Sequence, residues 1–283
     1  MIIIKKPTAL KEFLDQQKAK HQIGFVPTMG ALHPGHLSLI EAAKKENSII
    51  ACSIFVNPTQ FNDPEDFKKY PVTLDKDILM LENARCNVLF LPAVSDIYPS
   101  GTTGLQHYDL GFLETVLEGK YRPGHFQGVC QVVHRLLEMV LPDNLYLGQK
   151  DYQQCMVIKK LIGLIGLEKK IKLNICPTLR ETDGLAMSSR NTRLLPAARQ
   201  KATTISAALR SIKENIQPGE TKHIKEEAEQ MLLKEDFRVD YVAIANADTL
   251  ELIDNWDGKQ KIVTLAAAFL HDVRLIDNMV INP

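Results

Sequence analysis

Short apolar runs alternate with helical patterns from Ile23 to Cys176. Continuous apolar runs such as "IIACSIFV" (49–56) and "NVLFLP" (87–92) alternate with segments such as "HLSLIEAAKK" (36–45), in which apolar positions recur every three or four residues. Strands that are apolar on both sides are typical of a parallel sheet covered by helices on both faces. The pattern therefore predicts a doubly wound, Rossmann-like α/β domain over 1–176, whose ligands bind beyond the carboxyl ends of its strands.

After Pro177 the pattern changes. Two charged amphipathic helices are predicted around Pro196 to Ile216 and Glu220 to Leu233, and the strand-like runs "VDYVAIA", "KIVTLAAAFL" and "VRLIDNMVI" follow them. Helices followed by strands without alternation are typical of an α+β arrangement. We therefore expect a second, smaller α+β domain over 177–283, with a boundary near Cys176 and Pro177.

Composition narrows the class of protein. The chain has 283 residues and is 45% hydrophobic, which is enough for a large core or for two ordinary ones. Its 34 basic and 34 acidic side chains cancel, so it lacks the overall field of a nonspecific nucleic-acid or membrane-surface binder. We expect small-molecule partners, with neither nucleic acid nor membrane among them.

The cysteines and the N-terminus bear on the compartment. The five cysteines are widely spaced and include no CxxC pair, so neither a disulfide framework nor a thiolate zinc site is indicated. The start "MIIIKKPTALKEF" lacks the basic-then-apolar order of a secretory signal, and no later apolar run has the length of a membrane span. We expect a soluble protein in the cytoplasm.

Candidate chemistry begins in "GFVPTMGALHPGHLSLIEAAKK" (24–45). Gly30 and Gly35 have the spacing of a phosphate-binding P-loop, but His36 stands where that loop needs Lys and Leu37 where it needs a hydroxyl, which disfavours a P-loop NTPase. A tight turn remains that carries His33 and His36 at a helix N-terminus, where free N–H groups and the helix dipole favour an anion. A surface turn with solvated histidines and a zinc pair are the alternatives for this segment alone.

Two later segments place charge beside predicted strand ends or in loops. "LGQKDYQQ" (147–154) brings Lys150, a point charge for phosphate, and Asp151, an acceptor for ribose hydroxyls, directly after a predicted strand. "DGLAMSSRN" (183–191) brings two hydroxyls and the guanidinium of Arg190 into a loop, a group that can clamp a polyphosphate. Each segment could also be an ordinary helix cap.

Two further segments supply amides and another cation. "FVNPTQF" (55–61) delivers Asn57 and Gln60 from the end of a predicted strand, and amides recognise hydroxyls and carboxylates without adding charge. Asn-Pro is equally a common turn signal. "YRPGHFQGVCQVV" (121–133) adds Arg122 and His125 ahead of a helix.

Taken in order, these segments resemble one family. "PTMGALHPGHLSLI", "FVNPTQF", "RPGHFQGV", "GQKDYQQ" and "DGLAMSSRN", together with "RLIDN" near the C-terminus, are similar to the motifs of the pantothenate synthetases, the pantoate–β-alanine ligases of the HxGH nucleotidylyltransferase superfamily. The resemblance implies ATP-dependent condensation of (R)-pantoate with β-alanine to pantothenate, AMP and pyrophosphate, through a pantoyl adenylate.

The resemblance also implies roles for particular residues. His33, His36, Lys150 and Arg190 are expected to take part in catalysis, with His36 as the proton donor or charge stabiliser. Gln60, Gln154, Asn57 and Arg122 are expected to bind pantoate or β-alanine. The residues expected to hold ATP are Met29, Gly30, Ala31, Leu32, His33, Pro34, Gly35, His36, Gly148, Gln149, Lys150, Asp151, Leu179, Met187, Ser188, Ser189 and Arg190. The last four resemble the second signature of class I aminoacyl-tRNA synthetases and would form a mobile clamp.

The same resemblance implies Mg²⁺ carried on the ATP phosphates, because no acidic cluster suggests a protein cage. It also implies a homodimer and a C-terminal domain that acts as a lid. Two positions depart from the family pattern. Gln149 stands where Glu is common, which removes a carboxylate beside Lys150, and "HDVRLIDN" replaces a "GKTRLIDN"-like sequence. We expect at most a modest effect on affinity or pH response.

Four other hypotheses compete with this one. A related nucleotidyltransferase would need extra cations for a phosphorylated substrate, and an aminoacyl-tRNA synthetase fragment would need a tRNA-binding domain. A noncatalytic nucleotide-sensing module predicts loss of the phosphate-handling side chains, yet His33, His36, Lys150 and Arg190 are all present. A purely structural protein leaves the polar segments unexplained.

Overall fold

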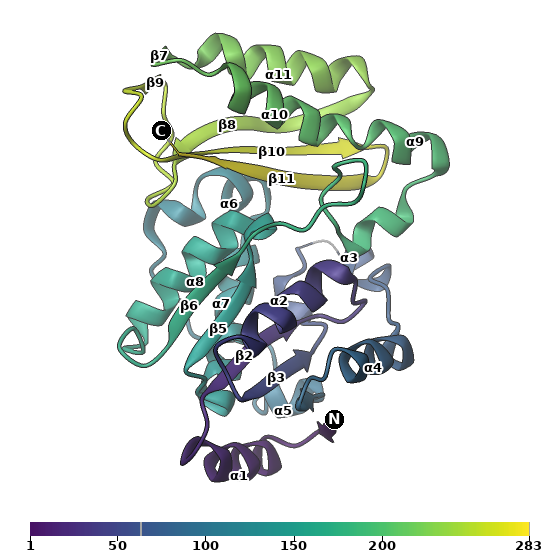
Figure 1. Ribbon diagram of the computed structural model, residues 1–283, viewed down its shortest axis with the longest axis vertical. Helices are drawn as coiled ribbons and strands as arrows, with labels where there is room; N and C mark the ends of the chain where they lie inside the picture. Colours follow the sequence, from purple (N-terminus) through teal and green to yellow (C-terminus); the bar gives the residue numbers. More distant parts are fainter. Residues whose placement is uncertain (63, 283) are drawn as a thin grey trace. The chain divides into compact units, whose positions relative to one another are not determined.

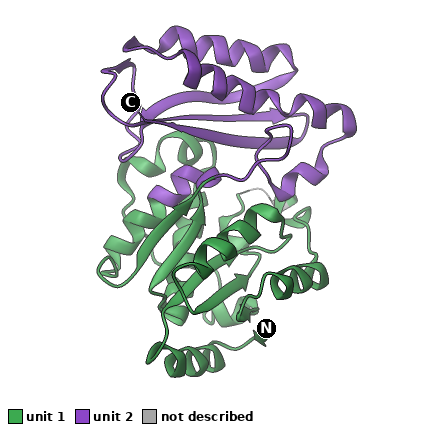
Figure 2. Ribbon diagram, in the orientation of Figure 1, with its two compact units in different colours: residues 1–148, 157–177 green, residues 149–156, 178–283 purple. Residues whose placement is uncertain are grey.

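The computed structural model describes residues 1–62 and 64–282 and divides into two compact units, which Figure 2 shows in different colours. Unit 1 consists of 1–148 and 157–177, and unit 2 of 149–156 and 178–283. The hydrophobic pattern carries no signal for the grouping of 149–156 with unit 2. These eight residues matter because they include Lys150, Asp151 and Gln154.

Unit 1 is built on a six-stranded sheet in the order β1-β4-β3-β2-β5-β6, and every neighbouring pair is parallel. The strands are β1 (Ile2–Ile4), β2 (Ile23–Thr28), β3 (Ile49–Ile54), β4 (Val88–Phe90), β5 (Asn144–Gly148) and β6 (Lys172–Cys176). Burial is nearly continuous along the four central strands β2 to β5, as expected for strands covered on both faces, whereas the edge strands β1 and β6 are partly exposed. The predicted doubly wound α/β fold is confirmed.

Helices cover both faces of this sheet. Residues of α2 and α4 pack with Val26, Ile50 and Cys52 in one buried cluster, and α2 lies in front of the strands in Figure 1. Side chains alternate along a strand, so Phe25 points to the opposite face, and α7 also contacts β2 and α1. The helical segments that begin in unit 1 are α1 (Pro7–Lys18), α2 (Pro34–Lys44), η1 (Pro58–Gln60), α3 (Pro64–Lys68), α4 (Leu74–Asn83), α5 (Val94–Ile97), η2 (Gly111–Glu114), α6 (Leu117–Tyr121) and α7 (His125–Val140).

The strand order places a topological switch point between β2 and β5. The chain steps from β2 to β3 to β4 in one direction, and β5 and β6 then add on the other side of β2. Crossover connections therefore leave β2 and β5 toward opposite faces, and in sheets of this kind ligands bind outside the carboxyl ends of two such strands. The residues at those ends are Thr28, followed by the turn with both histidines, and Gly148.

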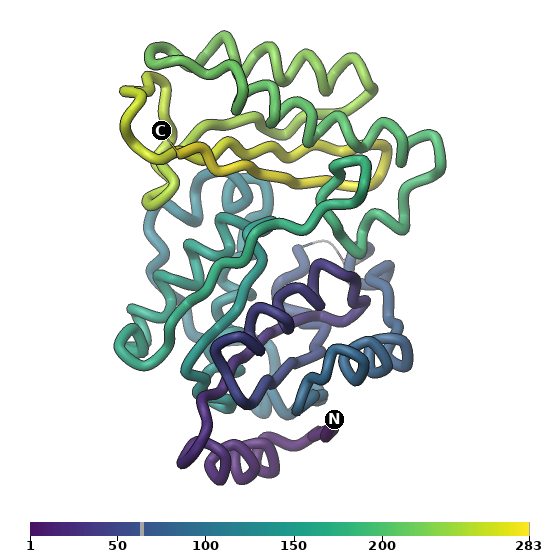
Figure 3. Tube along the Cα trace, in the orientation of Figure 1, coloured from purple at the N-terminus to yellow at the C-terminus, as the bar shows by residue number. Residues whose placement is uncertain are grey.

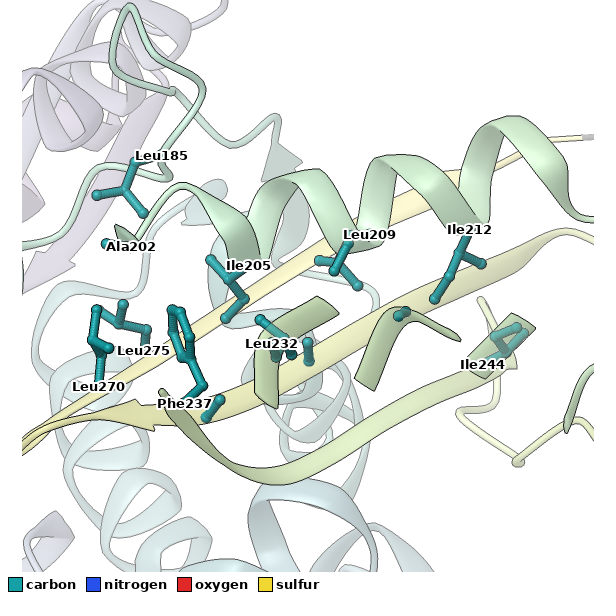
Figure 4. Close-up of a cluster of buried hydrophobic side chains, with 14 of the residues drawn as sticks. Leu185, Ala202, Ile205, Leu209, Ile212, Leu232, Phe237, Ile244, Leu270 and Leu275 are labelled. Carbon is teal, nitrogen blue, oxygen red and sulfur yellow. The ribbon is translucent and has the colours of Figure 1, made fainter. Parts of the chain in front are cut away.

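Unit 2 is an antiparallel sheet in the order β11-β10-β8 with helices on one face. The three strands run alongside one another in Figure 3. Side chains of α10 point into a cluster with α11 and the sheet (Figure 4), in which Ile205, Leu209, Leu232 and Leu270 are fully buried. The remaining elements are η3 (Gln149–Asp151), α8 (Tyr152–Leu164), η4 (Ser189–Arg193), α9 (Pro196–Lys201), α10 (Thr204–Asn215), β7 (Gly219–Glu220), α11 (Lys222–Lys234), β8 (Phe237–Asn246), β9 (Asn255–Trp256), β10 (Ile262–Leu270) and β11 (Val273–Ile281).

The prediction of one helix from Pro196 to Ile216 is wrong in detail. The structure has two helices, α9 and α10, separated at Ala202 and Thr203. The hydroxyl of Thr203 donates to the carbonyl of Gln200 at 2.9 Å, and such local bonds compete with the helical ladder. The hydrophobic period continues through the break because Ala202 is fully buried, so the pattern alone does not reveal it.

The close approach of α7 to η1 depends on Gly128. A Cβ built at Gly128 would lie 2.1 Å from the carbonyl oxygen of Thr59 and 2.7 Å from Cα of Gln60. The carbonyl of Gly128 also accepts from Nδ2 of Asn57 at 3.1 Å. Since backbone lies on both sides of this contact, no side chain can move aside to make room.

We therefore expect Gly128→Ala to destabilise the protein by about 1–3 kcal/mol or more, because forced overpacking outweighs the gain of about 1 kcal/mol that Ala brings to a helix interior. Gly163 in α8 is the matched control, because a Cβ there meets nothing within 4 Å. Gly163→Ala should stabilise by roughly 0.5–1 kcal/mol. Urea unfolding of both variants measures the difference, and equal midpoints would contradict the close-approach argument.

Candidate functional site

The turn that follows β2 carries both histidines of the predicted nucleotide site. Gly30 (φ 81°) and Ala31 (φ 49°) both have left-handed backbones. The hydroxyl of Thr28 accepts from the N–H of Gly30 at 3.2 Å and donates to the carbonyl of Ser53 at 2.7 Å, which ties the turn to the end of β3. Gly suits such a turn without strain, whereas Ala31 needs support from its surroundings.

That support comes from Asp77 on α4, whose side chain is 1% exposed. Its carboxylate accepts the N–H groups of Ala31 (2.9 Å) and Leu32 (2.8 Å) and the hydroxyl of Thr73 (3.0 Å). A Cβ at Gly30 would lie 3.1 Å from the same carboxylate. One buried anion therefore holds the turn from behind, and it satisfies N–H groups that would otherwise be buried without partners.

His33 and His36 lie together where α2 begins. Their ring centroids are 4.0 Å apart, and Nδ1 of His36 accepts from the backbone N–H of His33 at 3.3 Å. Because Nδ1 accepts, the proton of a neutral His36 ring is on Nε2, which makes Nε2 a donor. The positive end of the helix dipole at the start of α2 adds to the attraction for an anion at this point.

The predicted amide pair lies beside this turn, also in unit 1. Nε2 of Gln60 lies 3.0 Å from Sδ of Met29, and Oε1 of Gln60 accepts from Nδ2 of Asn57 at 3.2 Å. Asn57 is 1% exposed, and its Oδ1 accepts from the hydroxyls of Tyr98 (2.8 Å) and Thr59 (3.1 Å). The amide of Asn57 therefore bonds within the protein and holds Gln60, while its own role in ligand binding stays a prediction.

Arg122 and His125 form a chain of hydrogen bonds that ends at the main chain of Gln60. Nη1 of Arg122 lies 3.0 Å from Nε2 of His125, and Nδ1 of His125 lies 2.8 Å from the carbonyl of Gln60. A guanidinium can only donate, so Nε2 accepts and the Nδ1–H donates to Gln60. His125 therefore fixes the main chain that carries the Gln60 amide.

The charged residues after β5 belong to unit 2. Lys150 and Asp151 lie in η3, and Gln154 lies in the first turns of α8. Asp151 is exposed and Lys150 is half-buried. The side chain of Gln149 donates to Oδ1 of Asn278 at 3.2 Å, so this departure from the family pattern bonds to β11.

The segment with the predicted phosphate clamp follows a tight hairpin in unit 2. The N–H of Met187 donates to the carbonyl of Leu179 at 3.0 Å, and Gly184 (φ 92°) forms the turn. Oγ of Ser188 accepts from the N–H of Arg190 at 3.3 Å, so Ser188 caps η4, as the alternative interpretation of this sequence expected. Arg199 bonds the carboxylate of Asp183 and holds its pKa below the usual value.

The predicted site residues thus form two groups. Unit 1 holds Met29, Gly30, Ala31, Leu32, His33, Pro34, Gly35, His36, Asn57, Gln60, Arg122 and Gly148, and unit 2 holds Gln149, Lys150, Asp151, Gln154, Leu179, Met187, Ser188, Ser189 and Arg190. Within unit 1, the contacts above bring Met29, Asn57 and Gln60 together and Arg122 against them through His125.

Sequence reasoning missed Asp77, Tyr98 and Arg180, which hold the loops from behind. Their spacing matches no motif. The one available signal is an acidic residue at a position of α4 whose helical period is otherwise apolar, between Leu74 and Leu81. A buried charge at such a position needs a partner, which is a reason to look for one.

The arrangement of His, Cys, Asp and Glu side chains shows whether the described residues could ligate a metal ion themselves. Among residues 1–62 and 64–282, no three His, Cys, Asp or Glu side chains are grouped to hold a metal ion. Asp77, the carboxylate beside the histidine turn, accepts from protein groups with both oxygens. These donors fit an ion that is held mainly by phosphate oxygens.

The thiols are not placed for covalent catalysis. Burial raises the pKa of Cys52, raises that of Cys86 to about 11 and raises that of Cys130 to about 12. A thiol with a raised pKa carries little thiolate at neutral pH, and the thiolate is the reactive form.

Over 1–62 and 64–282, no helix combines the length and apolar character that crossing a membrane requires.

A parallel sheet with a histidine turn at its switch point, and with cationic and amide side chains in both units, defines an α/β nucleotide-dependent enzyme of Rossmann-like topology. Within this class, the chain belongs to the pantoate–β-alanine ligase family, whose model matches residues 2–280. It is therefore a ligase, and the resemblance in the sequence motifs is confirmed.

Relatives match along the whole chain. The chain is 44% identical over 285 residues to the pantothenate synthetase of Cytophaga hutchinsonii, covering 99% of each, and 42% identical over 282 residues to that of Porphyromonas gingivalis, again covering 99% of each. The crystal structure of pantothenate synthetase from Thermus thermophilus matches with a TM-score of 0.91 and 39% identity over all of both chains. A pantoate–β-alanine ligase from Francisella tularensis, complexed with beta-gamma ATP and β-alanine, matches with a TM-score of 0.82 and 38% identity over 99% of this chain and 97% of that one.

Asp77→Asn tests the support of the histidine turn. The amide keeps one acceptor but turns its NH₂ toward a backbone N–H, and an unsatisfied buried group costs about 1–3 kcal/mol. We expect a loss of stability of that size, and a loss of ligase turnover of about 10²-fold if the turn shifts by roughly 1 Å. Urea unfolding and steady-state rates measure the two effects.

Asp75→Asn is the matched control, because Asp75 lies on the same helix and is exposed. It should change neither quantity appreciably. If the two variants behaved alike, Asp77 would have no special part in holding the turn.

Proposed function

We propose that the chain joins pantoate to β-alanine with ATP in two steps. In the first, a carboxylate oxygen of pantoate attacks the α-phosphorus of ATP, the bond to the bridging oxygen breaks, and pyrophosphate leaves. In the second, the amine of β-alanine attacks the acyl carbon of pantoyl adenylate, AMP leaves with the electron pair, and the amine loses a proton. The products are pantothenate, AMP and pyrophosphate.

The histidine turn at the β2 end of the switch point is the observation that carries the proposal. It combines a helix N-terminus, two adjacent imidazoles and backbone held by a buried carboxylate. Adenylyl transfer needs little covalent help from a protein but needs fixed donors for the charge that moves onto phosphate oxygens. We assign His36, through Nε2–H, to that charge, and His33 to the phosphates beside it.

Unit 2 would supply the remaining contacts to ATP. Lys150 is assigned to phosphate, Asp151 to the ribose hydroxyls, and Met187–Arg190 to a clamp on the triphosphate. A guanidinium such as that of Arg190 binds phosphate oxygens in pairs, whereas an ammonium acts as a point charge. In this proposal unit 2 acts as a lid, as the family resemblance implies.

Gln60 and Gln154 are assigned to pantoate, whose hydroxyl and carboxylate groups suit amides. In unit 1, Gln60 is held by Asn57 on its side chain and by His125 on its main chain. A side chain that is fixed in advance loses little entropy when a ligand binds. Arg122 acts here through His125, and its direct contact with substrate is part of the proposal.

Three further features complete the proposal. Mg²⁺ bound to the triphosphate would neutralise its charge and is assigned no protein cage. The chain is proposed to act in the cytoplasm, where buried and unpaired cysteines such as Cys52 are common. It is also proposed to form a homodimer, and light scattering that showed only monomer at micromolar concentration would contradict that state.

Pyrophosphate release from Mg²⁺-ATP tests the two-step scheme. With pantoate alone, we expect release limited to about one equivalent per site, because the adenylate stays bound. Addition of β-alanine should start multiple turnover, with AMP and pantothenate formed in equal amounts. ATP binding without pantoate-dependent release would instead favour a nucleotide-sensing module.

His36→Asn tests the assigned donor while keeping the cap. The Asn oxygen takes the position of Nδ1 and can still accept from the N–H of His33, but Nε2 is lost. We expect the rate of adenylate formation to fall by about 10²-fold or more, the scale for one transition-state donor. Thermal unfolding should be nearly unchanged, and a normal rate would exclude the role.

Gln60→Ala should instead act on pantoate. We expect a higher KM for pantoate with a smaller change in kcat, because the lost contact is made in both ground and transition states. Gln131→Ala, on the outer part of α7, is the control and should leave both constants alone. A change confined to the KM for ATP would mean that the two pockets are assigned in reverse.

A further inference from the structure

Two adjacent residues of β11, Asp277 and Asn278, bond the two segments of unit 2 that are proposed to bind nucleotide, 149–151 and 179–190. Successive side chains of a strand point to opposite faces. Asp277 pairs in register with Ala266, which belongs to the cluster under α10 and α11, and Asn278 pairs with Leu265 on the other face. β11 contacts both η3 and η4.

Asn278 holds the turn that carries Lys150. It is 2% exposed, and its Nδ2 donates to the carbonyls of Gln149 (2.9 Å) and Lys150 (2.8 Å), while its Oδ1 accepts from the side chain of Gln149. Both hydrogens of the amide are used, one on each carbonyl. The two bonds to carbonyls fix the main chain of η3, so the placement of the Lys150 backbone depends on a strand more than 120 residues later.

Asp277 holds the hairpin that leads to Arg190. Its side chain is fully buried and accepts from Nη1 (2.6 Å) and Nη2 (2.9 Å) of Arg180. Arg180 also donates to the carbonyls of Gly184 (3.1 Å) and Asn278 (3.3 Å), so one guanidinium joins the hairpin to both β11 residues. Leu185, at the other side of the turn, is buried in the core cluster (Figure 4).

We propose that Asp277 and Asn278 are positioning residues that set the Gln149–Asp151 turn and the 179–190 segment on one rigid strand. This inference rests on the proposed function, because it assigns the two segments to the same nucleotide. Neither residue touches ATP in this proposal. Asn278 acts through Lys150, and Asp277 acts through Arg180.

The role of Asn278 and the role of Asp277 can be measured separately. In Asn278→Ala, amide hydrogen exchange in 149–156 should rise by about 10-fold or more, with 179–187 little changed. In Arg180→Lys, which keeps the charge but loses the fork, the opposite pattern is expected. Leu275→Ala on the same strand is the control, because Leu275 is buried in the core and bonds neither loop. It should show no preference for either segment.

Kinetics then tests whether position matters for the reaction. Loss of an outer residue that orients a metal ligand typically lowers affinity or activity by about 10-fold to 100-fold, and we apply the same scale to these positioning residues. We expect the KM for ATP of Asn278→Ala to rise by about that factor, with the KM for β-alanine unchanged. If that variant does not fold, Asn278→Ser, which keeps one donor, takes its place and should show a smaller loss.

Each outcome decides one point. Exchange that rises equally in both segments, or a KM for ATP that stays normal while 149–156 loosens, would overturn the positioning roles. An unmodified chain without pantoate-dependent pyrophosphate release would refute the proposed function instead, and the exchange pattern would still decide whether β11 holds the two loops.

Discussion

The backbone N–H and carbonyl groups of the turns that follow the strands need hydrogen-bond partners inside the protein, and the structure of the site depends on this constraint. A turn that leaves a strand has no sheet ladder for its N–H and carbonyl groups, and a buried group without a partner costs about 1–3 kcal/mol. The chain meets the constraint with a few buried side chains: Asp77 for the N–H groups of Ala31 and Leu32, and Asn278 for the carbonyls of Gln149 and Lys150.

The same logic explains why a polar side chain beside the proposed pantoate site bonds several groups within the protein. Asn57 is almost fully buried and bonds Tyr98, Thr59, Gln60 and the main chain. Gln60 is left with a fixed main chain and an amide at the edge of the site. Substrate groups of this kind need a rigid outer layer, because an amide or imidazole on a loose loop would lose its alignment to thermal motion.

Each unit carries its own set of proposed site residues. Unit 1 offers imidazoles, amides and a helix N-terminus, which suit the transferring phosphate and pantoate. Unit 2 offers the ammonium of Lys150 and the guanidinium of Arg190, each carried on a segment that β11 holds.

The sequence by itself determined the parallel sheet, the helices over it, the C-terminal α+β unit and the segments that carry the chemistry, because hydrophobic period and turn residues are local properties. It did not reveal the edge strand Ile2–Ile4, whose three residues become a strand only by pairing with Val88–Phe90, nor the break between α9 and α10. Tertiary structure alone placed 149–156 with unit 2 and decided the partners of Asp77, Asp277 and Asn278. Apart from the local bond between Thr73 and Asp77, those contacts join residues 45 to 129 positions apart, and no local pattern records which distant backbone group a buried polar side chain will satisfy.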